Sequence, residues 1–256
     1  MTAFKALFIS NLKRRLIDGF AVGYNLMFPL LMIFLLGFLC KGMYRDQIIT
    51  SYQYYGIVII PFCMFLSVIT AAYAGKDDAY ANTADRILVA PVSNAAIVFS
   101  KIFAEIIVFT GCSFIVLVLS VCLFDVCDIK YIVHILILYI VIAFLSASVG
   151  TYFGLGMKDF MKFKNILSIP VLIFAIFGGC FYQFGTLNKI LSLVMNLSPL
   201  RWINKSLFLL IYDKNSTVLY ILNLIMLIVG CVFTLLAIIS FKREEYGNGE
   251  LPGYEK

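Results

Sequence analysis

Six long apolar runs constrain this chain more than any other feature of its sequence. Each approaches the length of about 20 residues that a helix needs to cross a hydrocarbon core about 30 Å thick. The runs must be helical, because an open strand in lipid would leave its backbone groups unpaired. They cover residues 20–40, 55–74, 102–124, 131–156, 166–182 and 218–241. The sequence therefore predicts an all-α integral membrane protein with six transmembrane helices in a single domain, residues 1–256.

The composition supports lipid as the solvent of this chain. Hydrophobic residues make up 62% of the sequence and charged residues 13%, whereas soluble domains have about 45–50% and about 25%. The net charge is +6, but the basic residues cluster at the ends of the apolar runs, so we expect no nucleic-acid partner. If both termini lie in the cytoplasm, 13 of the 20 Lys and Arg residues lie on the cytoplasmic side, in accord with the positive-inside rule.

A basic, amphipathic segment, residues 2–18, precedes the first run. Its apolar residues recur at helical spacing, and its basic residues lie largely elsewhere on the helical wheel. We expect a helix on the inner leaflet, with lipid head groups contacted by Lys5, Lys13, Arg14 and Arg15. A loosely ordered, positively charged anchor is the alternative.

The segment 183–216 is the least regular part of the chain. It is amphipathic, interrupted by Pro199, and too short for two full membrane helices. Two short helices at the outer boundary, or a re-entrant pair, fit this pattern, with Trp202 and Tyr212 in an interfacial aromatic belt. The polar, glycine-rich residues 242–256 predict a flexible cytoplasmic tail.

Several kinds of chemistry have no motif in this sequence. The only Gly-Lys pair lacks the upstream glycine of a P-loop, so we expect no ATP site. The seven cysteines lack metal-ligand spacing, and His134 is expected to be an interfacial residue rather than a base. Glu105, four residues after Lys101, predicts an ion pair within one helix. We therefore expect a chain that is not itself an enzyme and that binds no metal or cofactor.

The run NTADRILVAPVS, residues 82–93, is a polar island between two hydrophobic runs. Asn82 or Thr83 can cap the start of a helix, and Asp85 then lies in the first turn, where the helix dipole favours an acid. Ile87, Leu88 and Val89 supply an apolar face. Pro91 ends the helix, and Ser93 or Asn94 restarts the chain in the next one. We expect a short amphipathic helix within residues 80–94 on the cytoplasmic side; a plain connector at the lipid surface is the alternative.

The same run resembles the cytoplasmic signature of the ABC-2 type transporter permeases, approximately G-T-x-E-x-L-L-x-T-P-V-S with a lysine some eight residues on. The positions that match as they stand are Thr83, Leu88, Pro91, Val92, Ser93 and Lys101. Asp85 and Ile87 are conservative replacements, whereas Asn82 replaces a glycine and Ala90 a threonine. The resemblance extends over nearly the whole chain, since L-S-P-L-R-W at residues 197–202 is similar to the family's L-x-P-x-x-W.

The resemblance implies that the helix at 80–94 is a coupling helix that docks in a groove of a separate ATPase subunit. Asp85 and Arg86 would pair with charges on the ATPase, and Ile87 and Leu88 would fill its apolar groove. The residues expected at this contact are Asn82, Thr83, Asp85, Arg86, Ile87, Leu88, Pro91, Val92 and Ser93. The partner ATPase, a dimer, would bind ATP and Mg. A second permease copy or a close paralogue would complete the complex in a bacterial plasma membrane.

Two aromatic stripes bear on the cargo. They comprise Tyr55, Phe62 and Phe65 in the second run and Phe174, Phe177 and Phe181 in the fifth. At spacings of three, four and seven residues, such stripes serve either for helix packing or for lining a pathway. As pathway residues they would suit a lipid-like or amphipathic cargo. In this family an antimicrobial or cytolytic peptide is our first expectation. Drugs, lipids or polysaccharides are alternatives, as is a non-transporting immunity or sensing protein.

Overall fold

The computed structural model describes residues 3–80, 83–90, 92–156, 160–182, 189–241 and 246. These residues form helices and connecting turns. The α-helices are α1 (Ala3–Ile17), α2 (Gly19–Leu39), α3 (Ser51–Tyr80), α4 (Ala84–Val89), α5 (Asn94–Phe124), α6 (Ile132–Gly156), α7 (Phe160–Phe177), α8 (Lys189–Asn196), α9 (Pro199–Ile211) and α10 (Thr217–Ile239). There are also two short 3-10 helices. One, η1 (Lys41–Tyr44), follows α2, and the other, η2 (Ile129–Tyr131), directly precedes α6. Of the expected tail 242–256, only Tyr246 lies within the described residues.

Among the described residues, five helical segments are long and apolar enough to cross a membrane. They are α2, α3, α5, the continuous η2 and α6, and α10. The predicted class, a helical membrane protein, is confirmed, but the predicted fifth run, 166–182, is not such a span. Within the residues that the structure fully describes, the apolar stretch of α7 is Leu167–Phe177. The helix ends there because Gly179 takes up a left-handed conformation, with φ +76°.

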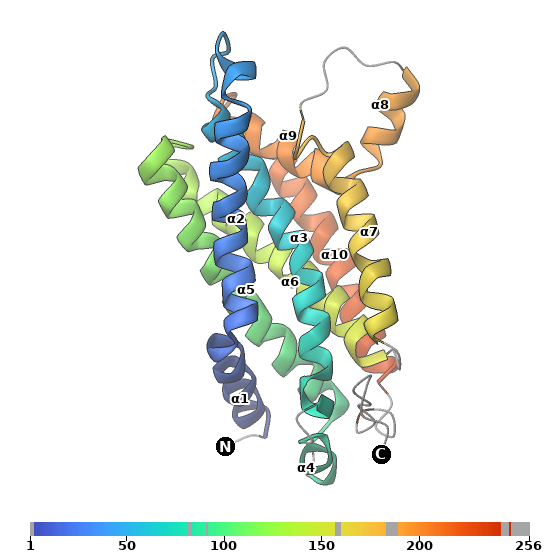
Figure 1. Cartoon of the computed structure of the whole chain (residues 1–256). Helices are drawn as coiled ribbons and strands as arrows, with labels where there is room; N and C mark the ends of the chain where they lie inside the picture. Colours follow the sequence, from blue (N-terminus) through green and yellow to red (C-terminus); the bar gives the residue numbers. More distant parts are fainter. Residues whose placement is uncertain are drawn as a thin grey trace.

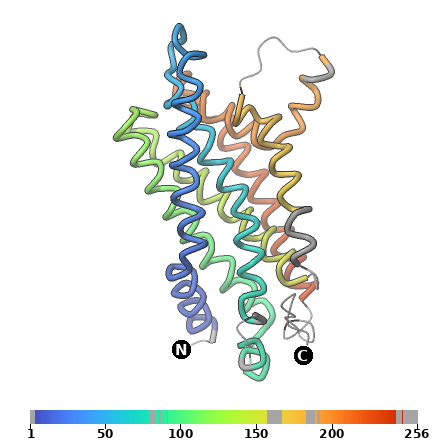
Figure 2. Tube along the Cα trace, in the orientation of Figure 1, coloured from blue at the N-terminus to red at the C-terminus, as the bar shows by residue number. Residues whose placement is uncertain are grey.

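Helix α3 is the central helix of the bundle. It lies between α2 and α7 and also packs against α5, α6 and α9 (Figure 1 and Figure 2). As a result, 89% of the residues in its 18-residue apolar window are buried inside the chain, compared with 22% for α2 and 28% for α10. The apolar core forms on all sides of α3, which is why this run is almost uniformly hydrophobic.

Helices α3 and α6 approach each other closely through small residues. A Cβ atom added to Gly154 would lie 2.3 Å from the backbone oxygen of Ala72, and one added to Gly75 would lie 2.8 Å from Gly154. Glycine at these positions lets the two backbones touch, as small residues do at helix contacts in membranes.

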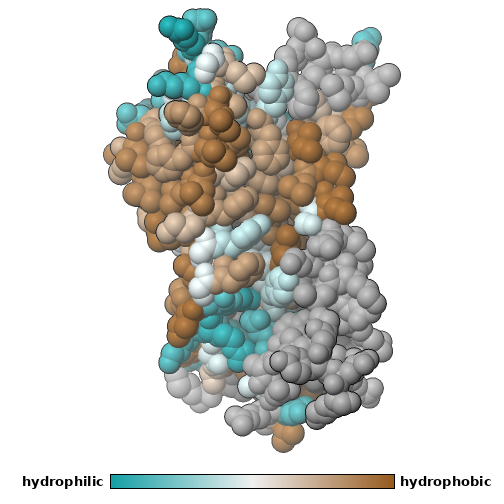
Figure 3. All heavy atoms as spheres, viewed as in Figure 1, coloured by the Kyte–Doolittle hydropathy of each residue, from teal (hydrophilic) through white to brown (hydrophobic). Residues whose placement is uncertain are grey.

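The short elements lie at the two ends of the bundle. Helices α1 and α4 occupy one end, which we call the α4 end, and η1, α8 and α9 occupy the other (Figure 1). Helices α8 and α9 are the short helices that the structure places within 183–216, although residues 183–188 lie outside the described part. On the face in Figure 3, a broad hydrophobic band separates hydrophilic residues beyond α2 from a hydrophilic patch near the α4 end.

Candidate functional site

Helix α4 presents two different faces. Ala84 is 2% exposed, and Ile87 and Leu88 are half-buried against a hydrophobic cluster that includes Ile97 of α5. On the outward side, Val89 is 88% exposed. Ile87 and Leu88 thus contact the rest of the chain with part of their surface, and the expectation that they also enter a partner's groove stays a prediction.

The other expected contact residues divide in the same way. Asp85 is exposed, whereas Val92 is 7% exposed and belongs to the same cluster as Ala84. The Ser93 hydroxyl accepts a hydrogen bond of 3.2 Å from the Ala96 amide and caps α5, as its position predicted. Asn82, Pro91 and the side chain of Arg86 lie outside the described part of the structure.

Thr83 does not cap α4 with its side chain. Its amide donates a hydrogen bond of 2.9 Å to the backbone oxygen of Asp78, in the last turns of α3. Its hydroxyl lies 3.3 Å from that oxygen and 3.3 Å from Oδ1 of the Asp78 carboxylate. The residue before α4 is thus held by α3 across the connection.

Asp78 contacts side chains from distant parts of the chain. Arg14 Nη1 lies 2.8 Å from its Oδ1, and Lys101 Nζ lies 2.6 Å from its Oδ2. The Tyr246 hydroxyl donates a hydrogen bond of 2.5 Å to Oδ2. We call Arg14, Asp78, Thr83, Lys101 and Tyr246 the Asp78 cluster. Its centre is buried, since the side chains of Asp78 and Lys101 are 2% and 3% exposed.

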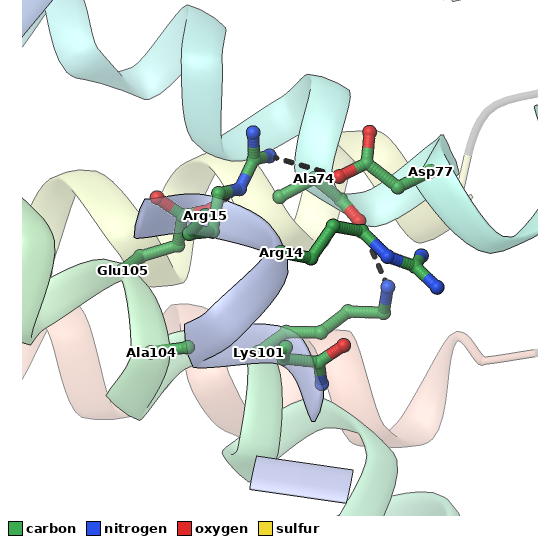
Figure 4. A pocket seen from close by; sticks show the side chains of 8 residues that line it. Arg14, Arg15, Ala74, Asp77, Lys101, Ala104 and Glu105 are labelled. Atoms are coloured by element: carbon green, nitrogen blue, oxygen red, sulfur yellow. Dashed lines mark hydrogen bonds and ion pairs between the residues drawn. The ribbon is translucent and has the colours of Figure 1, made fainter. Parts of the chain in front are cut away.

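A second group of charges surrounds Arg15. The guanidinium forms an ion pair with Glu105, lies 2.9 Å from Asp18 and 3.5 Å from Asp77, and donates a hydrogen bond of 2.9 Å to the Thr70 oxygen. We call these five residues the Arg15 cluster. Burial lowers the pKa of Arg15, but the carboxylates of Glu105, Asp77 and Asp18 outweigh it and raise the pKa above its usual value. Figure 4 shows Arg15 between Glu105 and Asp77.

The expected ion pair within α5 does not form. Glu105 pairs with Arg15 of α1, and Lys101 pairs with Asp78 of α3. Lys101 also donates a hydrogen bond of 2.8 Å to the backbone oxygen of Ala74, which directs it away from Glu105 (Figure 4). The physical reason is burial: two deeply buried charges need close partners, and the neighbouring helices supply them.

The four expected lipid anchors have different environments. Lys5 and Lys13 are exposed and remain available to head groups. Arg14 is half-buried on Asp78, and Arg15 is 3% exposed within the chain. Arg15 therefore attaches α1 to α3 and α5 rather than to lipid, which corrects the expectation for this residue.

The aromatic stripe of α3 packs inside the chain. Tyr55, Phe62 and Phe65 are 1%, 1% and 8% exposed. The ring of Phe62 lies 5.3 Å from that of Phe181, between centroids. This corrects the pathway alternative for the α3 stripe and favours packing, although Tyr55 also borders a cavity of about 140 Å³ near η1. The stripe on and beyond α7, Phe174, Phe177 and Phe181, is only half-buried.

Sequence reasoning missed Asp77, Asp78 and Tyr246. The two adjacent acids lie shortly beyond the second apolar run, directly after Lys76, and acids at such a position could have indicated charged partners on neighbouring helices. Tyr246 carried no such signal, because its partner lies 168 residues away.

Together, the bundle and the charged clusters define a multi-pass helical membrane protein whose α4 end is fixed by buried ion pairs. The family model of the ABC-2 type transporters matches residues 2–212, from α1 to the end of α9. The chain therefore belongs to this family and is a membrane subunit of an ABC transporter. No curated protein matches the sequence significantly.

Proposed function

We propose that this chain is the permease subunit of an ATP-driven exporter, and that α4 is the coupling helix that docks on a separate ABC ATPase. The observation that carries the proposal is the outward side of α4, where Asp85 and Val89 are exposed. An acid and an apolar side chain on a helix whose other side is packed can enter a protein groove without disturbing the permease. Val89 then supplies the most exposed apolar contact, beside the partly exposed Ile87 and Leu88.

The distribution of charge supports an external energy source. In the described membrane spans, the charged residues lie toward the α4 end, apart from Lys130 at the start of the α6 span. A proton or ion relay would need ionisable groups deeper along the helices. We therefore propose that a dimer of ATPase subunits binds ATP and Mg. A second permease copy or a close paralogue would cover part of the apolar faces of α2 and α10.

We further propose that the α4 end and both termini face the cytoplasm of a bacterial cell. The excess of Lys and Arg on that side supports this orientation. Helix α7 would be the sixth crossing, because it runs along α3 between the two ends of the bundle despite its short apolar part (Figure 1).

The proposed cargo is an amphipathic peptide of the antimicrobial or cytolytic kind. Its support is the uncharged, aromatic character of two parts of the chain that remain accessible. These are the half-buried Phe174, Phe177 and Phe181, and the cavity bordered by Tyr44 and Tyr182. Stimulation of ATP hydrolysis by a cationic amphipathic peptide, but not by a polysaccharide or by added lipid, would support this cargo.

The test uses the ATPase that co-purifies with the chain in lipid nanodiscs. The variant Asp85→Ala/Val89→Asp changes only exposed positions of α4, so the fold should be kept. We expect its affinity for the ATPase to fall about tenfold or more, as for loss of a central interface residue. The matched control is Asp128→Ala/Ile48→Asp at the other end, where both positions are also exposed.

Equal affinity of both variants and the wild type would exclude α4 as the docking helix. If the wild type recruits no ATPase at all, the non-transporting membrane protein takes the place of the exporter.

A further inference from the structure

Asp78 joins four segments of the chain, three of which are distant from it in the sequence. Arg14 belongs to α1, Thr83 precedes α4, Lys101 belongs to α5, and Tyr246 follows α10. Their atoms lie 2.5 to 3.3 Å from the carboxylate. The single carboxylate at the end of α3 is therefore the point at which these segments meet.

The attachment of α4 to this point is polar at one end and apolar along one face. Thr83 is bonded to Asp78, and Ile87 and Leu88 rest on the hydrophobic cluster of α5 and α6. Tyr246 takes part in both attachments. Its ring belongs to that cluster together with Ala84, and its hydroxyl bonds to Asp78.

Tyr246 is fixed from three directions. Its ring lies 5.1 Å from that of Phe241, between centroids, and Lys101 Nζ lies 5.8 Å from the centroid of the Tyr246 ring. The third contact is the hydrogen bond from its hydroxyl to Asp78. Burial, followed by the charge of Asp78, raises the pKa of the hydroxyl above its usual value. The hydroxyl therefore keeps its proton and remains a donor to the carboxylate.

We propose that Asp78 is a positioning residue that transmits movement of α4 to α1 and α5. Tyr246 is the latch that holds α4, α1 and α5 together at Asp78. The inference rests on the proposed function of α4 as the coupling helix. A pull on α4 acts through Thr83 on Asp78, and through the charged contacts of Asp78 on Arg14 and Lys101. The Arg15 cluster is a second connection between α1, α3 and α5, so the three helices follow as one body.

Tyr246→Phe tests the latch, because it removes the hydroxyl and keeps the ring and its packing. In nanodiscs, we expect the amides of residues 83–90 and 3–17 to exchange hydrogen about tenfold faster than in the wild type. The amides of α9 should not change. Tyr220→Phe on the exposed side of α10 is the matched control and should leave both segments unchanged. Thr83→Val is a second variant, which should release residues 83–90 without α1.

The readout in α1 separates transmission from a local defect, because the substituted hydroxyl bonds to Asp78 and not to α1. Faster exchange confined to the neighbourhood of residue 246, or no change in either segment, would overturn the inference. In the complex, Tyr246→Phe should still bind the ATPase but should lose at least half of the stimulation of hydrolysis by peptide. Failure of the wild type to bind any ATPase refutes the proposed function, whereas the exchange result still decides whether the latch exists.

Discussion

Arg15 and Glu105 place opposite charges where their side chains are 4% and 1% exposed. A buried pair contributes little net stability, but loss of one partner leaves the other charge without compensation in a medium of low polarity. The pair joins residues 90 positions apart on different helices, so sequence spacing could not predict it. Spacing favoured the local pair of Glu105 with Lys101 because the i,i+4 rule describes a single helix and not the helices packed around it.

Removal of the Arg15 guanidinium should therefore destabilise the fold. We expect Arg15→Met to lower the free energy of unfolding in mixed micelles by about 3–5 kcal/mol. Arg15→Met/Glu105→Leu should recover much of this loss, because no unpaired carboxylate remains at position 105. The control is Lys130→Met, which breaks an ion pair whose side chains are 60% and 66% exposed and should cost under about 1 kcal/mol. A small effect of Arg15→Met alone would contradict the buried pair.

At the scale of the helices, hydropathy predicted where most of them lie, because lipid forces an apolar run to become helical. It could not predict how far they continue into polar sequence: α3 extends to Tyr80 and α5 begins at Asn94, beyond the predicted limits of 74 and 102. Nor could it predict which sides meet. Helix α6 has no distinct polar side, so its hydropathy does not indicate that Gly150 and Gly154 face α3; the signal for this contact is their G-x-x-x-G spacing, which hydropathy does not register.

The glycine contact gives a prediction for this pair of helices. Gly154→Leu would place a side chain against the backbone of Ala72, which cannot move away without separating α3 from α6. We expect a loss of about 3 kcal/mol in unfolding free energy, at the upper end for overpacked sites. Gly111→Leu on α5 is the control, because nothing lies within 4 Å of a Cβ atom there. Similar melting temperatures for the two variants would show that the helices do not meet as described.

At the scale of the whole molecule, the sequence indicated the class and an orientation, but not the central position of α3. Helix α3, with 89% of its apolar window buried, is surrounded by other helices of the chain. Helix α2, with 22% buried, faces mainly outward. Mean hydropathy cannot separate them, since lipid and protein interior favour the same side chains. The candidate site was foreseen in part: the short helix lies between α3 and α5, but two groups of the Asp78 cluster come from elsewhere, the charge of Arg14 from α1 and the Tyr246 hydroxyl from beyond α10.

The orientation and the sixth crossing can be checked together in a variant without native cysteines. Single cysteines at Ile48 and Tyr182 should react with a membrane-impermeant maleimide in intact cells, and those at Val89 and Gly156 only after permeabilisation. All four positions are exposed. Gly156 and Tyr182 flank α7, so opposite reactivity requires α7 to cross the bilayer. Labelling of both from the same side would mean that it does not.

The Asp78 cluster has a consequence for the order in which the protein is made. Ribosomes synthesise residues 14, 78, 83 and 101 well before residue 246. The hydrogen bond from Tyr246 to the Asp78 carboxylate therefore forms only after α10 has been synthesised. Until then Asp78 has its two cations but not the tyrosine, and the cluster around Ala84 lacks one of its rings. Closure of this end is thus a late event in biogenesis, and a chain that stalls before α10 would present an unfinished α4 end to chaperones and proteases.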